Sequence, residues 1–129
     1  MNLTQNLFGD ELLSAVFANF SKAGQTFKAT EGKLMLIFHE LFQRKEFRPL
    51  AQGYPFDPDG FEPRSKALSD AFESLQQSRM IGRMNPDLVE YKISDALHVR
   101  YQKFIEPKLK AKRQLVQKLA HEVERKLVG

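Results

Sequence analysis

Hydrophobic residues recur at intervals of three and four positions in three segments of the chain, the pattern of a helix with one buried face. The first segment spans residues 10–23 and is followed by Gly24, a residue type that commonly ends helices. The second spans residues 30–45, and Thr30 is suited to cap its amino end. The third spans residues 63–78 and begins with a proline, which fits the first turn of a helix. The pattern predicts three helices that share one apolar core.

Residues 49–62 interrupt this pattern between the second and third predicted helices. The segment contains three prolines and two glycines, and residues 57–60 have the composition of a β-turn, so we expect a loop. Its aromatic side chains indicate a loop that is held against the core or that faces a partner protein. These aromatic residues are Tyr54, Phe56 and Phe61. An irregular segment of this length is unusual in a small domain and suggests a role of its own.

The apolar spacing changes to alternation beyond the third predicted helix. Residues 80–84 are short and apolar, residues 85–87 carry a turn signal with a proline, and residues 88–93 alternate apolar and polar side chains. This pattern predicts a β-hairpin. A small group of helices leaves one edge of its core open, and we expect the hairpin, with a short strand from elsewhere in the chain, to cover that edge.

The C-terminal quarter returns to helical spacing. Ser94 can cap a helix over residues 95–105, and Pro107 is expected to stop or kink it. A second helical segment is predicted over residues 107–127, where apolar residues seven positions apart form a seam like that of a weak coiled coil. The seam needs an apolar partner, either the chain's own first helix or another subunit, and we favour a homodimer. The predicted dimerisation residues are Leu109, Val116, Leu119 and Val123.

The chain of 129 residues has the length of one domain, is 42% hydrophobic and 28% charged, and contains no cysteine. Disulfides and thiolate metal sites are thereby excluded. No apolar run reaches the about 20 residues of a membrane span, and the start does not resemble a secretory signal, so we expect a cytoplasmic protein without membrane contact. The net charge of +4 is uneven. Residues 96–129 carry nine Lys and Arg against three Glu, a net +6, whereas the rest of the chain carries −2.

Residues 64–105 resemble the second half of a winged helix-turn-helix regulator of the MarR or PadR type. In those families the recognition helix runs through a leucine into a strand with an isoleucine and a basic residue, and a turn and a second strand follow. The matching residues here are Leu75, Met80, Ile81 and Arg83, with residues 91–95 ending the second strand and opening the next helix. The resemblance implies a mainly α fold with a small β-hairpin, a winged helix-turn-helix with extra N- and C-terminal helices. The 49–62 segment departs from the pattern, because these regulators have a short joint there.

A weaker resemblance is to small bacterial domains of the Panacea type. In those domains a central helix with a lysine–leucine pair, here Lys33 and Leu34, leads through an irregular loop to a helix that ends in a strand. The glycine–proline pair that precedes that helix is absent, since Glu62 and Pro63 stand there.

The resemblance to winged-helix regulators implies that the helix at 64–78 enters the major groove of double-stranded DNA while the hairpin contacts the backbone or minor groove. The expected DNA-binding residues are Arg64, Ser65, Lys66, Ser69, Arg83 and Lys92. Asp70 and Glu73 on the same helix oppose phosphate contact, unless one accepts a hydrogen bond from a cytosine amino group. A helix face that is merely solvated remains the alternative.

Catalytic and metal-binding patterns are absent from the sequence. His39, His98 and His121 lack the spacing of a ligand pair, and Asp57 and Asp59 do not fit a calcium loop. There is no glycine-rich phosphate loop and no serine elbow. We therefore expect no enzyme, no metal and no cofactor. Two hypotheses remain: a bacterial transcriptional regulator that binds DNA as a homodimer, and a winged-helix protein-interaction module that presents its aromatic loop to a partner.

Overall fold

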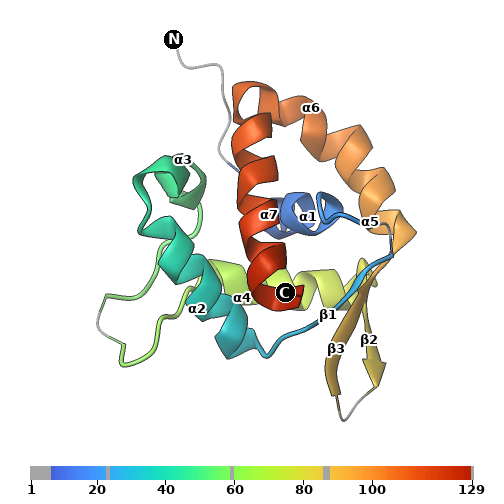
Figure 1. Ribbon diagram of the computed structural model, residues 1–129, viewed down its shortest axis with the longest axis horizontal. Coiled ribbons are helices and arrows are strands. Elements are labelled where there is room, and N and C mark those ends of the chain that lie inside the picture. Colours follow the sequence, from blue (N-terminus) through green and yellow to red (C-terminus); the bar gives the residue numbers. More distant parts are fainter. Residues whose placement is uncertain (1–6, 23, 59, 86–87, 129) are drawn as a thin grey trace.

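The computed structural model describes residues 7–22, 24–58, 60–85 and 88–128, and it is mainly helical with one small antiparallel sheet (Figure 1). In chain order the elements are α1 (Glu11–Ala18), β1 (Thr26–Lys28), α2 (Glu31–Phe42), the 3-10 turn η1 (Lys45–Phe47), α3 (Arg48–Ala51), α4 (Lys66–Gln77), β2 (Ile81–Asn85), β3 (Leu88–Ile93), α5 (Asp95–Arg100), the π-helical turn η2 (Tyr101–Ile105), α6 (Glu106–Leu109), the 3-10 turn η3 (Lys110–Lys112) and α7 (Arg113–Val128). The three helices predicted at 10–23, 30–45 and 63–78 are confirmed as α1, α2 and α4, each shorter than predicted.

The sheet has the strand order β1–β3–β2, so β3 lies in the centre and pairs antiparallel with both neighbours. The predicted hairpin is confirmed as β2 and β3, and Pro86 and Asp87 of its predicted turn lie outside the described residues. The alternation rule does not identify β1 in advance, because a three-residue strand is too short to show a period.

One face of the sheet packs on the helices and the other faces solvent. Phe27 of β1 lies opposite Tyr91 of β3, and their rings stack with centroids 5.6 Å apart. Phe27 also stacks on Phe17 of α1, at 4.9 Å. Lys28 and Lys92 point to the other face and are exposed. The sheet thus closes the helical core with aromatic side chains and presents lysines to solvent.

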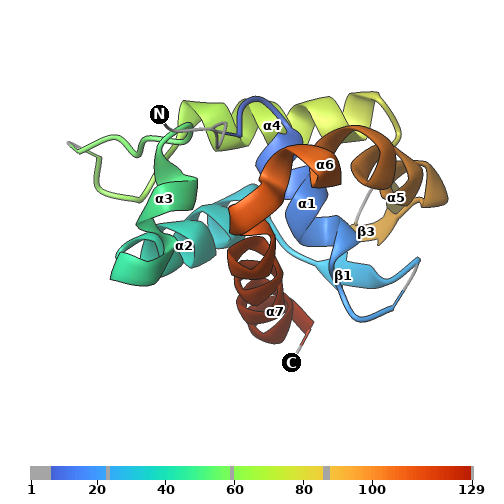
Figure 2. The same ribbon diagram turned by 90° about the horizontal axis from the view of Figure 1, so that it is seen from above.

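The helices form layers, with α4 and α7 on opposite sides of the molecule and α1 and α2 between them (Figure 2). α1 contacts both outer helices, and its six successive residues 12–17 are all buried. A helix with neighbours on two sides requires such a broad buried surface. The polar faces of α4 and α7 therefore look in different directions.

The segment predicted as a loop at 49–62 begins with helical structure. Residues 45–51 form η1 and α3, and Pro49 stands in the first turn of α3, where its missing N–H costs no hydrogen bond. Leu50 is buried against the core. The irregular part is therefore shifted along the chain to residues 52–65 and keeps its predicted length, because α4 also begins three residues later than predicted.

The chain after Ser94 forms a continuous helical arc that does not end at Pro107. The hydroxyl of Ser94 accepts a hydrogen bond from the Leu97 N–H at 3.3 Å, which confirms the predicted cap. The arc runs from α5 through the π-helical turn η2 into α6, with Pro107 in the first turn of α6. The direction changes instead at Lys110, whose φ is +47°.

The predicted dimerisation seam is buried inside the chain. Leu109 is 1% exposed, and the other three residues are fully buried: Val116, Leu119 and Val123. Because the helix breaks at Lys110, Leu109 lies on α6 and the others on α7, so no continuous heptad seam exists. α7 packs on α1, α2 and β1 of the same chain. The prediction of a dimer through this seam is wrong, because these intramolecular neighbours already cover it.

Candidate functional site

Helix α4 is amphipathic and lies on an outer side of the molecule. Its inner face is buried and consists of Leu68, Ala71, Phe72 and Leu75. The hydroxyl of Ser65 caps the helix by accepting a hydrogen bond from the Leu68 N–H at 3.3 Å, and Ser65 is fully buried. The predicted DNA contact by Ser65 is therefore wrong, because its side chain is occupied below the surface.

Three other predicted residues meet at the amino end of α4. Arg64, Lys66 and Ser69 line an open groove of about 640 Å³ together with residues 55–58. The N–H of Asp57 donates a hydrogen bond of 2.7 Å to the carbonyl of Arg64, which ties the preceding segment to the start of the helix. Sequence reasoning thus identified three residues that share one surface.

Polar side chains on the outer face of α4 are partly engaged with one another. Lys66 forms an exposed ion pair of 2.9 Å with Asp70, one helical turn away. Glu73 accepts a hydrogen bond of 3.2 Å from the Gln77 amide. The middle of the exposed face therefore carries two carboxylates, with cations at the amino end.

The other two predicted DNA-binding residues lie near the opposite end of α4. Arg83 on β2 and Lys92 on β3 line an open hollow of about 450 Å³, and Lys92 lies opposite Gly82 in the sheet. β2 follows α4 after a short turn and contacts it. A helix of 12 residues spans about 18 Å, so the predicted cations form two groups about that far apart.

Arg79 lies between α4 and β2 in a backbone conformation that sequence reasoning missed. Its φ is +63°, in the left-handed region that favours glycine. Its N–H donates to the Gln76 carbonyl at 3.1 Å, and the Met80 N–H donates to the Leu75 carbonyl at 2.9 Å. This is the Schellman ending of a helix, with arginine at the position where glycine is usual. Because residue 79 is not a glycine, the sequence gives no signal for this helix ending.

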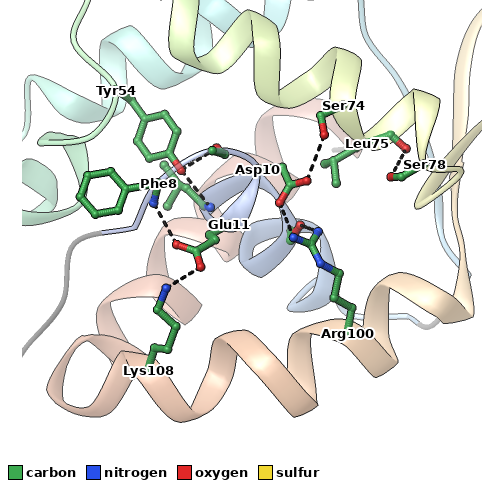
Figure 3. Close-up of polar contacts among 12 residues, drawn as sticks. Phe8, Asp10, Glu11, Tyr54, Ser74, Leu75, Ser78, Arg100 and Lys108 are labelled. Atoms are coloured by element: carbon green, nitrogen blue, oxygen red, sulfur yellow. Dashed lines mark hydrogen bonds and ion pairs between the residues drawn. The ribbon is translucent and has the colours of Figure 1, made fainter.

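A second polar cluster surrounds the amino end of α1 (Figure 3). Asp10 accepts hydrogen bonds from Ser74 of α4 at 3.2 Å and from Arg100 of α5 at 2.7 Å. Glu11 pairs with Lys108 of α6 at 2.5 Å. Each carboxylate thus meets one cation from another helix, so this cluster holds α1 in place and leaves no excess charge.

Many basic residues of the C-terminal quarter are paired with carboxylates of the same chain. Besides Arg100 and Lys108, Lys118 pairs with Glu46 at 2.6 Å and Lys126 with Glu40 at 3.2 Å. Two further pairs form inside the segment, Arg113 with Glu106 and Arg125 with Glu122. The concentration of positive charge in the sequence is therefore largely balanced in the fold by carboxylates from Asp10, α1, α2, η1 and the segment itself.

Two glutamates in these ion pairs have lowered pKa values. A hydrogen bond from Lys118, with the nearby Arg44, lowers the pKa of Glu46 below its ordinary value. A hydrogen bond from Arg125 lowers the pKa of Glu122 in the same way. Both carboxylates are thereby held in their charged form.

The three aromatic residues of the 49–62 segment have different surroundings. Tyr54 is fully buried, so the expectation that it faces a partner is wrong. Phe56 is half-buried and its ring lies 5.0 Å from that of His39. Phe61 is fully exposed. One of the three residues is therefore available in full to a binding partner.

Within the described ranges, no group of three or more His, Asp or Glu side chains is arranged to hold a metal ion. None of the described helices is long and apolar enough to span a membrane. Searches of protein families, curated proteins and solved structures find no match to this chain.

Proposed function

We propose that this chain binds double-stranded DNA as a winged helix-turn-helix module, with α4 in the major groove and the β2–β3 ribbon as the wing. The order of elements supports the proposal, because α1, β1, α2 and α4 are followed by two paired strands, and β3 pairs with both β1 and β2. The insertion of η1, α3 and an irregular segment between α2 and α4 lengthens the joint and leaves α4 on the surface. A regulator of transcription is the class of protein for which such a module is typical.

The observation that carries the proposal is the distribution of cations around α4. Arg64 and Lys66 lie at its amino end, and Arg83 and Lys92 lie beyond its carboxyl end. Phosphates flank the major groove on both sides, so cations at both ends of a helix are placed to contact them while its middle faces bases. Asp70 would then face bases, where a carboxylate accepts a hydrogen bond from a cytosine amino group.

Binding to a random duplex at two salt concentrations tests the proposal. Four phosphate contacts predict that affinity falls on the order of 100-fold between about 50 and 200 mM salt, because neutralised phosphates release counterions. Fluorescence anisotropy with a labelled duplex measures both affinities. No binding at the lower concentration would reject DNA binding.

A pair of charge reversals locates the contact. The double variant Arg64→Glu, Lys66→Glu should abolish binding at low salt, because it places carboxylates beside phosphates. The matched control Lys103→Glu, Lys110→Glu changes the net charge equally at exposed positions on η2 and η3. Equal losses in the two double variants would show that only total charge matters, and would remove the role assigned to α4.

A protein-interaction module is the second candidate, and one observation favours it. Asp70 and Glu73 make the middle of the exposed α4 face acidic, and the fully exposed Phe61 lies on the segment that leads into the helix. An acidic face with an aromatic side chain nearby fits a basic protein surface better than DNA. This candidate replaces the first if the duplex does not bind at low salt.

A further inference from the structure

The hollow between the carboxyl end of α4 and the sheet is lined by more positively than negatively charged side chains. Arg79, Arg83 and Lys92 line it together with one carboxylate, that of Asp95. In three other open hollows among the described residues, carboxylates equal or outnumber the cations. They are the groove at the amino end of α4, the neighbouring hollow lined by Glu31, Asp57, Glu62 and Arg64, and the basin around Asp10 and Glu11. An excess of positive charge in a concave surface favours an anion.

Arg79 supplies an independent reason to assign this hollow a ligand. The Schellman ending of α4 requires a left-handed residue at this position, and glycine adopts that conformation without strain. Arginine is strained there, and its side chain makes no hydrogen bond or ion pair to the described residues that would offset the strain. Local backbone strain is found preferentially at functional sites. The guanidinium lines the hollow, where it is available to an external partner.

Two glycines line the hollow. Gly82 on β2 lies directly opposite Lys92, and a Cβ atom added at Gly82 would meet nothing within 4 Å. Gly24 has a φ of +71°, and a Cβ there would lie 3.8 Å from Cε of Lys92. A phosphate group can therefore approach the strand backbone at Gly82, where no side chain projects into the hollow.

We propose that this hollow is a phosphate-binding site in which Arg79 and Lys92 hold a backbone phosphate of the bound duplex. The inference rests on the proposed DNA binding and adds a contact at the carboxyl end of α4. The guanidinium of Arg79 donates two hydrogen bonds to phosphate oxygens, and the Lys92 ammonium contributes a point charge. Asp95 faces the same hollow and limits its positive charge, so the site accepts one phosphate group and does not hold a larger polyanion by itself.

The variant Arg79→Gly separates binding from stability. Glycine relieves the left-handed strain, so the midpoint of thermal unfolding should stay the same or rise by up to about 3 °C. Affinity for the duplex should fall about fivefold to tenfold at low salt, and the slope of log affinity against log salt should decrease by about one. Lys92→Gln should lower the affinity and the slope in the same way.

The chain contains a matched control in Lys110. It is the other described non-glycine residue with a positive φ, it is exposed, and it lies between α6 and α7, away from the sheet (Figure 1). Lys110→Gly removes the same charge and also replaces a residue with a positive φ, but the ψ of Lys110 is −116°, outside the left-handed helical region of a Schellman ending. It should leave the unfolding midpoint unchanged or raise it, and it should leave duplex affinity and salt slope unchanged.

A titration of the full chain with inorganic phosphate, followed by the amide NMR signals of Gly82 and Arg79, completes the test, with sodium chloride at equal ionic strength as the control. If the duplex binds and Arg79→Gly behaves like Lys110→Gly, the inference is overturned and the proposed DNA binding stands. If the duplex does not bind but phosphate shifts these signals to saturation, and Arg79→Gly abolishes the shift, the site holds a free phosphate group and DNA binding fails. If neither ligand binds, both proposals are overturned.

Discussion

Tyr54 shows how a single buried hydroxyl can hold a long connection in place. Its side chain is fully buried, and its hydroxyl donates a hydrogen bond of 2.8 Å to the Gly9 carbonyl and accepts one of 3.2 Å from the Leu12 N–H (Figure 3). The preceding Gly53 lies so close to the N-terminal segment that an added Cβ would be 2.3 Å from the Leu7 carbonyl oxygen. The segment after α3 is therefore fixed against the start of α1 by one side chain and one close backbone contact.

Burial raises the pKa of the Tyr54 phenol above its ordinary value, and this predicts how stability depends on alkaline pH. In the unfolded chain the phenol loses its proton above about pH 10, whereas in the folded chain it remains protonated. The unfolded state then binds fewer protons, so the free energy of unfolding should decrease by up to about 1.4 kcal/mol per pH unit above pH 10.

The variant Tyr54→Phe tests this dependence. At pH 7 it should lose about 1–3 kcal/mol of stability, because the Leu12 N–H and the Gly9 carbonyl lose their partner. Between pH 10 and 12 its stability should decline less steeply than that of the natural chain. Urea unfolding at a series of pH values measures both effects, and parallel declines in the two proteins would contradict a phenol that stays protonated when folded.

At the scale of elements, hydrophobic spacing predicted the helices and strands that are long enough to show a period. α1, α2, α4 and the β2–β3 hairpin follow from this spacing, and the cap of α5 follows from the serine at position 94. β1 is too short to show alternation, and the break at Lys110 carries neither proline nor glycine, so neither could be predicted. The burial of α7 depends on where α1 lies, which is a property of the tertiary fold and leaves no local signal.

The packing of α7 gives a prediction for Val116. This residue is fully buried, and α7 contacts α1 and α2 of the same chain. Val116→Ala should lower the free energy of unfolding by about 2 kcal/mol, because two buried methyl groups are lost and a cavity remains. The exposed neighbour Gln117 provides the control, and Gln117→Ala should change stability by less than about 0.5 kcal/mol.

Light scattering on the same two variants tests the intramolecular packing. The molecular mass of Val116→Ala should equal that of the natural chain, because the side chain contacts its own core. A lower mass with an unchanged unfolding midpoint would instead mean that Val116 lies between subunits.

At the scale of the whole molecule, the sequence showed where the charged residues lie along the chain but not which of them form ion pairs in the fold. The net +6 of residues 96–129 indicated a basic surface. In the fold, however, Asp10, α1, α2 and η1 supply carboxylates to Arg100, Lys108, Lys118 and Lys126. The residues of the candidate site likewise could be predicted only in part from the sequence. The exposure of Arg64, Lys66, Arg83 and Lys92 agrees with the predicted polar pattern, whereas the assignment of Arg79 needs its backbone angle. Spacing along a chain shows which residues are polar, and only the fold shows which of them meet.

The ion pairs of Glu46 and Glu122 predict how the stability of the fold changes at acid pH. The lowered pKa values of Glu46 and Glu122 mean that the folded chain binds fewer protons than the unfolded chain at moderately acid pH. Their contribution to stability is therefore complete above the ordinary glutamate pKa near 4.5 and is lost as the pH falls through the lower values of the folded state. The unfolding midpoint should fall between pH 5 and pH 3, and added salt should reduce this fall because both residues lie near the surface.

The double variant Glu46→Gln, Glu122→Gln should show a smaller fall of the unfolding midpoint over the same pH range, since neither glutamine titrates. Glu73→Gln is the control, because Glu73 accepts a hydrogen bond from the neutral Gln77 amide and not from a cation. Thermal unfolding followed by circular dichroism at pH 3, 5 and 7 measures all three proteins. If acidification lowers the unfolding midpoint of the double variant and of Glu73→Gln by the same amount, the ion pairs of the two glutamates with Lys118, Arg44 and Arg125 do not stabilise the fold.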